Sequence, residues 1–175
     1  MELVVAADEN WGIGFHGTQN LVIPEDRRHF RAVTGHGTVI VGRRTLLDFP
    51  GGRPLPKRRN IVLSRDPDFA VEGAETAHSV EEALALVADG DPEGVFVCGG
   101  ESVYRAFLPY CRRAYVTRIF ASPEADAFFP KLEELPQWRL VDPGEDREHQ
   151  GVRYCFQIWE NNGHWLERPQ GLRLA

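Results

Sequence analysis

Two glycine-containing turns carry the residues of this chain that are best suited to chemistry. Gly42-Arg43-Arg44-Thr45 follows an apolar run at 38–41, and Gly99-Gly100-Glu101-Ser102 follows a second apolar run at 95–98. At both places a short β-type run gives way to a helical pattern. Backbone N–H groups there point beyond the carboxyl edge of the predicted sheet, where they can bind phosphate. Two such turns, one with paired arginines, indicate a ligand with several phosphates, and a dinucleotide fits best.

The global composition is that of a small globular protein. The chain has 175 residues, 42% of them hydrophobic, which is enough for one domain with a substantial core. A net charge of −6 argues against nucleic acid, which usually selects a basic face. No apolar stretch approaches the roughly 20 residues that span a bilayer, so we expect no membrane association. Cys98, Cys111 and Cys155 have neither disulfide nor metal-ligand spacing, and we expect a cytoplasmic setting and no metal site.

Apolar runs alternate with helical patterns along the chain. We predict strands at 3–7, 38–41, 60–64, 94–98, 115–120 and 152–159, and helices at 24–33, from 43, at 80–87 and at 102–108. Pro24 at a first-turn position and Gly35 after the last turn delimit the first helix. This order predicts a single-domain α/β fold with a mainly parallel central sheet, an antiparallel C-terminal edge and helices on both faces.

No internal repeat or linker divides the chain, and we expect it to act as a monomer. Residues 1–160 form the expected domain. Residues 161–175 lose periodicity and form a tail, which Trp165 and Leu166 could dock onto the domain surface.

Seven motifs, taken together, resemble the dihydrofolate reductase family in their order and spacing. In chain order they are Asn10-Trp11-Gly12-Ile13-Gly14, Ile23-Pro24-Glu25-Asp26 with Phe30, Val41-Gly42-Arg43-Arg44-Thr45, the run from Arg53 to Ser64, Gly99-Gly100-Glu101-Ser102-Val103-Tyr104, Tyr115-Val116-Thr117, and Asp126 through Phe129-Pro130. Each motif alone is weak, but seven in order over residues 1–160 make a specific match.

The resemblance implies an activity and a cofactor. Members of the family use NADPH to reduce 7,8-dihydrofolate to 5,6,7,8-tetrahydrofolate, with hydride transfer to C6 and protonation at N5. The implied partner is therefore a small-molecule substrate of one-carbon metabolism, and the implied protein is a target of antifolates.

The resemblance also assigns a catalytic acid, Asp26, and a strand threonine, Thr117, that hydrogen-bonds to it. By itself Asp26 is typical of an acid that favours the start of a helix. An apolar cleft would instead desolvate the carboxylate and raise its pKa. Arg58 is assigned to the folate α-carboxylate, which arginine can bind with two parallel hydrogen bonds. The implied substrate-binding residues are Val4, Val5, Ala6, Arg27, Phe30, Phe49, Leu55, Arg58, Cys98 and Thr117.

For the cofactor, the resemblance implies a cradle at the strand ends. Thr45 and neighbouring N–H groups would bind the pyrophosphate, and Arg43, Arg44, Ser64 and Arg65 would bind the adenosine 2′-phosphate, which favours NADPH over NADH. The Gly99-Gly100 peptide bond is expected to be cis. The implied cofactor-binding residues are Ala7, Ile13, Gly14, Gly42, Arg43, Arg44, Thr45, Leu63, Ser64, Arg65, Cys98, Gly99, Gly100, Glu101, Ser102, Val103 and Tyr104.

The chain departs from the family's common pattern at four places. Asn20-Leu21 stands where Pro-Trp is usual, Arg27 where an aliphatic residue is commoner, Leu46 where a tryptophan usually follows the first glycine turn, and Glu101-Ser102 where the pair is usually led by glycine. None of these changes removes an obligatory group.

Two other interpretations stay open at this point. Riboflavin-pathway reductases have a similar fold and use NADPH, but they reduce a ribosylamino-pyrimidine. A non-catalytic relative could hold nucleotide or folate without turnover. The combination of Asp26, Thr117 and Arg58 argues against the first, and the intact acid and glycine turns argue against the second.

Overall fold

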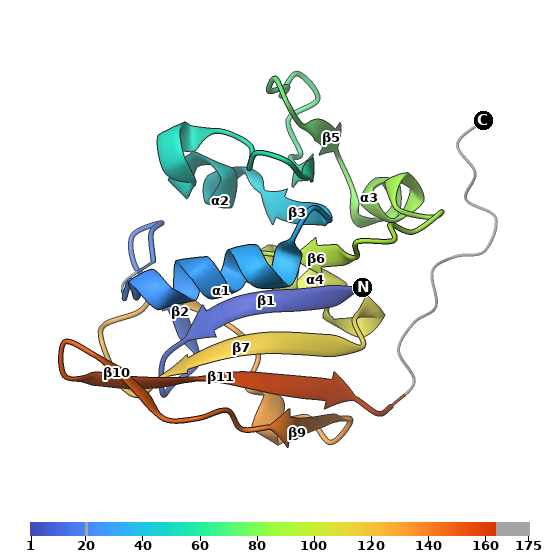
Figure 1. Ribbon diagram of the computed structural model, residues 1–175. Coiled ribbons are helices and arrows are strands. Elements are labelled where there is room, and N and C mark those ends of the chain that lie inside the picture. The colour runs from blue at the N-terminus through green and yellow to red at the C-terminus, as the bar shows by residue number, and fades with distance from the viewer. Residues whose placement is uncertain (20, 164–175) are drawn as a thin grey trace.

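A twisted central sheet organises the protein. The computed structural model describes residues 1–19 and 21–163, and within them nine strands form one sheet in the order β10-β11-β7-β1-β6-β3-β4-β5, with β9 also paired to β11. The pairs from β7 through β5 are parallel, and β11 pairs antiparallel with β7, β9 and β10. The strands are β1 (Glu2–Ala7), β3 (Thr38–Gly42), β4 (Arg59–Leu63), β5 (Glu75–Ala77), β6 (Val95–Val97), β7 (Arg113–Ile119), β9 (Trp138–Asp142), β10 (Arg147–His149) and β11 (Val152–Asn161). The expected parallel sheet with an antiparallel edge is confirmed (Figure 1).

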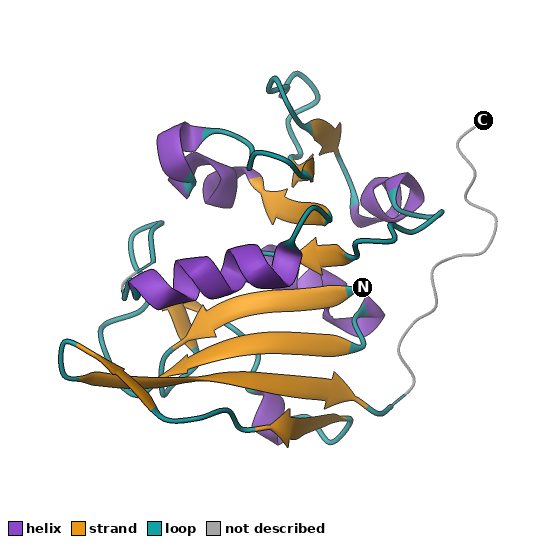
Figure 2. Cartoon of the chain, in the orientation of Figure 1, coloured by secondary structure: helices purple, strands orange, loops and turns teal. Residues whose placement is uncertain are grey.

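Helices cover both faces of the sheet, because successive residues of a buried strand point in opposite directions. Leu3 and Val5 of β1 pack in a core with α3 (Val80–Leu86) and α4 (Glu101–Phe107). Val4 packs in a second core with α1 (Pro24–Thr34) and α2 (Arg43–Asp48). Figure 2 shows α1 lying along the near face of the sheet, and Figure 1 shows α4 behind it. One continuous sheet therefore separates two apolar layers.

The local sequence signals set the limits of α1. The helix begins at Pro24, and Gly35 follows its last residue with a φ of 52°, a left-handed conformation that favours glycine. Both limits agree with the prediction. Since α1 begins with Glu25 and Asp26, this start places two carboxylates in the first turn.

The predictions missed three short strands and a second small sheet. β5, β9 and β10 have three to five residues each, and β9 buries only Trp138. Gly12–Gly14 (β2) pairs with Ala127–Phe128 (β8) in a separate ribbon. Pro50–Gly52, Leu108–Tyr110 and Leu132–Glu134 each form one 3₁₀ turn, the last in an interval expected to hold no helix.

The last strand extends one residue into the predicted tail. β11 continues through Asn161, whose side chain donates to the Cys111 carbonyl at 3.2 Å and accepts from the Gly163 N–H at 3.0 Å. Trp165 and Leu166 lie outside the described residues. Across the described part of the chain, no helix is long and apolar enough to cross a membrane.

Candidate active site

The carboxyl ends of four adjacent parallel strands meet at one edge of the sheet. β4, β3, β6 and β1 are neighbours there, and the predicted cofactor residues follow these strand ends. The Gly42 N–H donates to the Gly99 carbonyl at 2.8 Å, so the two glycine turns lie directly side by side. In open α/β sheets such an edge is where ligands bind.

The Gly99-Gly100 turn has a backbone conformation that favours glycine and lies close to Thr45. Its peptide bond is cis, which confirms the expectation, and Gly99 has a φ of 124°. A Cβ atom added at Gly99 or Gly100 would lie 3.4 or 3.3 Å from the Thr45 hydroxyl. The absence of a side chain at both glycines thus lets the Thr45 hydroxyl lie close to the backbone of the second turn.

The predicted arginines at this edge differ in their partners. Arg43 lies over the Phe69 ring, 4.7 Å from its centroid, with its Nη1 3.5 Å from the Asp66 carboxylate. Arg44 and Arg65 are exposed, and no carboxylate of residues 1–19 or 21–163 pairs with either of them. Glu101 pairs with Arg105 at 3.6 Å, which offsets its negative charge near the turn. The sequence analysis missed His78, whose Nδ1 lies 2.8 Å from the Ser64 carbonyl at the same corner.

Asp26 lies at the start of α1, beside β7, whereas the two glycine turns follow β3 and β6 on the other side of β1. The Thr117 hydroxyl donates to Asp26 Oδ1 at 2.5 Å, across 91 positions of sequence. Thr117 stands opposite Ala6 in the β1–β7 register, so it emerges on the face that α1 covers. Burial raises the pKa of Asp26, as expected, while the Thr117 hydrogen bond and the positive charges of His29 and Arg27 partly offset that rise.

Apolar side chains pack on the same face of the sheet as this carboxylate. Val4, Cys98, Phe30, Phe49 and Leu55 belong to one packed cluster on the α1 face of the sheet. The Val5 side chain lies on the opposite face, with α4, so Val5 can border the cleft only through its backbone. The Tyr104 hydroxyl is buried and donates to the Val4 carbonyl at 2.7 Å, which leaves the ring and backbone of Tyr104 for other contacts.

The remaining predicted cofactor residues flank the two glycine turns. Ile13 and Leu63 are partly buried against the core on the α4 face, Ala7 and Val103 are buried in it, and Gly14 lies in β2. Ser102 is exposed, and Ser64 accepts from the Asp66 N–H at 3.2 Å.

Comparison with known proteins fits this geometry. A family model described as dihydrofolate reductase matches residues 1–161. The chain belongs to the dihydrofolate reductase family. The dihydrofolate reductase of Neisseria meningitidis serogroup B is 41% identical to it, over 88% of this chain and 93% of the relative. That of Mycobacterium tuberculosis is 44% identical, over 75% of this chain and 80% of the relative. The solved dihydrofolate reductase of Enterococcus faecalis, complexed with NADP(H) and RAB-propyl, has a TM-score of 0.82 and 34% identity, covering 93% of this chain and 96% of its own.

Within this dihydrofolate reductase fold, Arg58 is held in place from three directions. It donates to the Thr34 hydroxyl at 3.0 Å, to the Pro56 carbonyl at 2.9 Å and to the Arg31 carbonyl at 3.5 Å. Burial and the charge of Arg31 lower the pKa of Arg58. Among the described residues no carboxylate pairs with Arg58, so its charge is available to an anionic ligand.

A polar cluster beside Asp26 was not found from the sequence. Glu25 accepts hydrogen bonds from Arg147 at 2.5 Å and from the Tyr154 hydroxyl, which ties the first turn of α1 to β10 and β11. His29 stacks on Phe156 with a centroid distance of 4.0 Å. Burial lowers the pKa of His29 although Asp26 opposes that shift. The three-residue spacing of Asp26 and His29 was the available signal, because such residues share a helix face.

Three departures from the common family pattern have a structural place. Leu46 is 1% exposed and lies in the core on the α1 face, in one cluster with Val4 and Phe96. Leu21 packs near Ile23 at the start of α1, whereas Asn20 lies outside the described residues. Arg27 is exposed on α1, so it acts on Asp26 through charge rather than contact.

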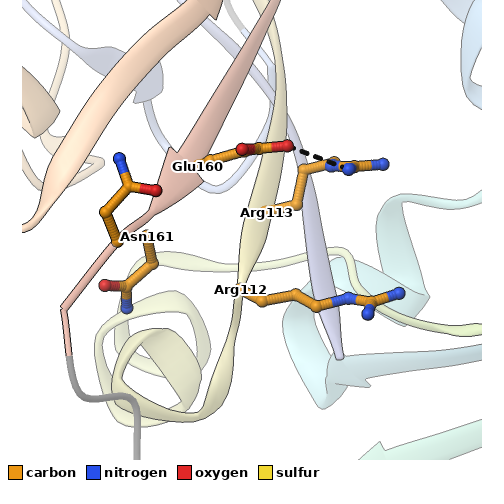
Figure 3. Close-up of a pocket in the computed structure, with 5 residues that line it drawn as sticks. Arg112, Arg113, Glu160 and Asn161 are labelled. Carbon is orange, nitrogen blue, oxygen red and sulfur yellow. Dashed lines mark hydrogen bonds and ion pairs between the residues drawn. The ribbon is translucent and has the colours of Figure 1, made fainter.

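A separate cavity of about 370 Å³ lies at the opposite end of β7. Figure 3 shows four of its five lining residues labelled, Arg112, Arg113, Glu160 and Asn161, with the Arg113–Glu160 ion pair at 2.9 Å. These residues stand at the amino end of β7, whereas Thr117 stands further toward its carboxyl end. This cavity is distinct from the Asp26–Thr117 pair.

The raised pKa of Asp26 predicts a stability effect. A carboxyl whose pKa is higher in the folded than in the unfolded state destabilises the fold above its folded pKa, and this cost vanishes below the unfolded value of 3.8. Asp26→Asn should therefore increase the free energy of unfolding at pH 7 relative to the wild type, since the amide oxygen can still accept from Thr117. Urea denaturation of both proteins from pH 7 to pH 4 should show the advantage shrinking as pH falls. A destabilised variant at pH 7 would contradict the desolvation argument.

Proposed function

We propose that this enzyme reduces 7,8-dihydrofolate to 5,6,7,8-tetrahydrofolate with NADPH. The observation that carries the proposal is the buried carboxylate of Asp26, which accepts from the Thr117 hydroxyl on the face of the sheet where Val4 and Cys98 pack. The cofactor assignment is supported by Arg44 and Arg65, exposed cations without ion-pair partners in the described chain, and by the NADP(H) complex of the Enterococcus faecalis relative. The two adjacent glycine turns beside Thr45 offer backbone N–H groups that suit a pyrophosphate.

Asp26 acts on the pterin. As a carboxylate it accepts two N–H groups of the ring at once, which orients the substrate and favours the protonated form of N5. The Thr117 hydroxyl fixes the carboxylate for this contact. NADPH, when bound, supplies the hydride that reaches C6. The apolar walls exclude bulk water and strengthen the electrostatic effect of the carboxylate.

Arg58 binds the other end of the substrate. Its three protein contacts fix the plane of the guanidinium, and a fixed fork suits the folate α-carboxylate. Phe49 and Leu55 pack against the apolar cluster on the α1 face, and we expect them to contact the substrate between its two ends. Since all these residues come from one chain, we also propose that a monomer suffices for activity and that antifolates bind the same cleft.

A direct assay tests the proposal. Purified protein should oxidise NADPH when dihydrofolate is added, followed by the fall in NADPH absorbance, and tetrahydrofolate should form in equal amount. Oxidation with a ribosylamino-pyrimidine but not with dihydrofolate would favour the riboflavin-pathway alternative. Tight NADPH binding without turnover of either substrate would favour a non-catalytic binding protein.

Thr117→Val tests the hydrogen bond to the catalytic carboxylate. Removing the donor raises the pKa of Asp26 further, so the inflection of kcat/KM assigned to Asp26 should move to higher pH. A hydrogen bond to a charged group contributes about 1.5–3 kcal/mol, so kcat/KM should fall about 10- to 150-fold. Thr38→Val is a matched control, because Thr38 donates to Asp91 at 2.8 Å at the far edge of the sheet. An unmoved inflection in Thr117→Val, or an equal shift in Thr38→Val, would argue against the assigned role.

A further inference from the structure

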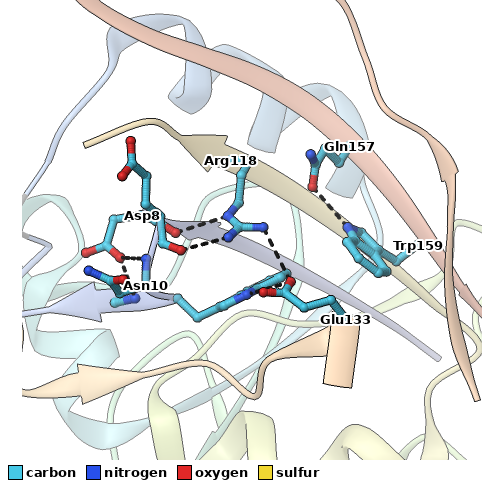
Figure 4. A network of polar contacts seen from close by, with 9 residues as sticks. Asp8, Asn10, Arg118, Glu133, Gln157 and Trp159 are labelled. Atoms are coloured by element: carbon cyan, nitrogen blue, oxygen red, sulfur yellow. Dashed lines mark hydrogen bonds and ion pairs between the residues drawn. The ribbon is translucent and has the colours of Figure 1, made fainter. Parts of the chain in front are cut away.

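The start of the glycine-rich segment after β1 is held by one partly buried arginine. Arg118 of β7 donates from Nε to the Asp8 carbonyl at 3.0 Å and from Nη2 to the Glu9 carbonyl at 2.9 Å. Its guanidinium carbon lies 4.1 Å from the centroid of the Trp11 ring. Its Nη1 is 3.7 Å from Glu133, which also accepts from the Trp11 indole N–H at 2.9 Å. Figure 4 shows these side chains converging from β7, the β1–β2 connection and the 3₁₀ turn at Leu132–Glu134.

Trp11 has a backbone conformation that needs such support. Its φ is 62°, in the left-handed region that bulky residues rarely adopt and that persists where the surroundings impose it. The ring is fully buried, stacked near Phe129 and edge-on to Trp159. The carbonyl of Trp11 accepts from the Phe129 N–H at 2.8 Å, and its own N–H donates to Asp8 at 3.1 Å. Ring, backbone and indole N–H are therefore all fixed at once.

This fixed tryptophan directly precedes the part of the loop assigned to the cofactor. Gly12–Gly14 follow Trp11 immediately, and the Gly12 N–H donates to Asp8 Oδ1 at 2.8 Å. A small rotation at Trp11 would displace Ile13 and Gly14. Arg118 thus controls the position of these two residues although it lies on the sheet beneath them.

Arg118 is also the chain neighbour of Thr117, and adjacent strand residues point to opposite faces. Thr117 holds Asp26 on the α1 face, while Arg118 holds the glycine-rich segment on the other. Two consecutive residues of the central strand β7 therefore fix both sides of the site. The relative position of the carboxylate and the nicotinamide-binding segment then depends on one rigid element.

We propose that Arg118 is a positioning residue for hydride transfer, acting through Trp11 on Ile13 and Gly14. The inference rests on the proposed NADPH-dependent reduction. Arg118 touches neither substrate nor cofactor; it sets the distance at which the loop holds the nicotinamide. Displacements near 1 Å at a reacting centre can cost up to about a hundredfold in rate.

Arg118→Met tests this assignment, because methionine keeps the apolar stem and removes the charge and donors. The single-turnover rate of hydride transfer should fall about 10- to 100-fold. The deuterium isotope effect on kcat, measured with NADPH labelled at the transferred hydrogen, should rise because hydride transfer becomes the slower step. Dihydrofolate affinity should stay within about twofold, since Asp26 and Thr117 lie on the other face of β7.

A readout without cofactor accompanies the kinetics. In the cofactor-free protein, Arg118→Met should accelerate amide hydrogen exchange at Gly12 and Gly14 about tenfold or more, while the amides of β7 stay protected. Arg118→Lys, which keeps the charge without the planar fork, should give intermediate values in both measurements. Trp11→Phe, which keeps a ring beneath the guanidinium, should also be intermediate; these two variants decide the matter if Arg118→Met does not fold.

Arg153→Met is the matched control. Arg153 is exposed on β11 and lies over the Phe120 ring at 5.2 Å, and within the described chain its side chain makes no hydrogen bond to residues 8–14. It should leave hydride transfer, isotope effect and loop exchange unchanged. Wild-type rates in the Arg118 variants, or an equal loss in Arg153→Met, would overturn the assignment. An inactive wild type would instead refute the proposed function, so the two failures are distinguishable.

Discussion

Asp26→Asn should lower kcat for dihydrofolate reduction at neutral pH by about a hundredfold or more, within the range that positioned acid–base and electrostatic groups contribute. The amide has nearly the same shape and can accept from Thr117. It cannot accept both pterin N–H groups, and it carries no negative charge to favour a protonated N5. NADPH affinity should change little, because the glycine turns lie across β1 from Asp26. Stopped-flow and steady-state rates, with NADPH titrated by fluorescence, measure both quantities.

The pH dependence of this variant gives a second criterion. Solvent can supply the N5 proton more readily in acid, so the deficit of Asp26→Asn should shrink as pH falls. Asp91→Asn is a suitable control, because Asp91 also accepts from a buried threonine but lies at the opposite edge of the sheet. A variant with wild-type kcat at neutral pH would remove Asp26 from the mechanism.

The first helix and its acid could be predicted because the signals are local. Pro24 and Gly35 delimit α1, and Asp26 falls in its first turn whatever the rest of the fold does. The contact between Asp26 and Thr117 joins residues 91 positions apart. Local pattern carries no information about such a pair, and only the ordered set of motifs indicated it.

The Arg118 cluster illustrates what sequence patterns leave out. Nothing near Trp11 signals a left-handed tryptophan, since its conformation depends on contacts with Arg118, Phe129 and Glu133, all more than 100 positions away. The short strands β9 and β10 were missed for a related reason. Their exposed residues pair with β11 through backbone hydrogen bonds, which hydrophobic periodicity does not report.

Charge-neutral substitution of the arginines at the cofactor corner should weaken NADPH selectively. Arg44→Gln with Arg65→Gln should raise KM for NADPH about 10- to 100-fold, because each contact to a phosphate contributes about 1.5–3 kcal/mol before solvent screening reduces it. NADH has no 2′-phosphate, so its KM should change by less than about twofold. Arg43→Gln should have a smaller effect than either, since Asp66 already offsets the charge of Arg43. Initial rates with each cofactor, at low and high salt, test this.

Asp66→Asn provides a test of opposite sign at the same corner. It removes a negative charge and frees Arg43, so KM for NADPH should fall while KM for NADH stays constant. Both changes should diminish at high salt, because these groups are exposed and screened. Arg139→Gln, an exposed arginine on β9 far from the strand ends, should alter neither KM. Equal weakening of NADPH and NADH binding by the Arg44 and Arg65 substitutions would mean that these arginines support the loop or the pyrophosphate. The preference for NADPH would then need a different source. His78, beside Ser64 at the same corner, would be the next residue to test.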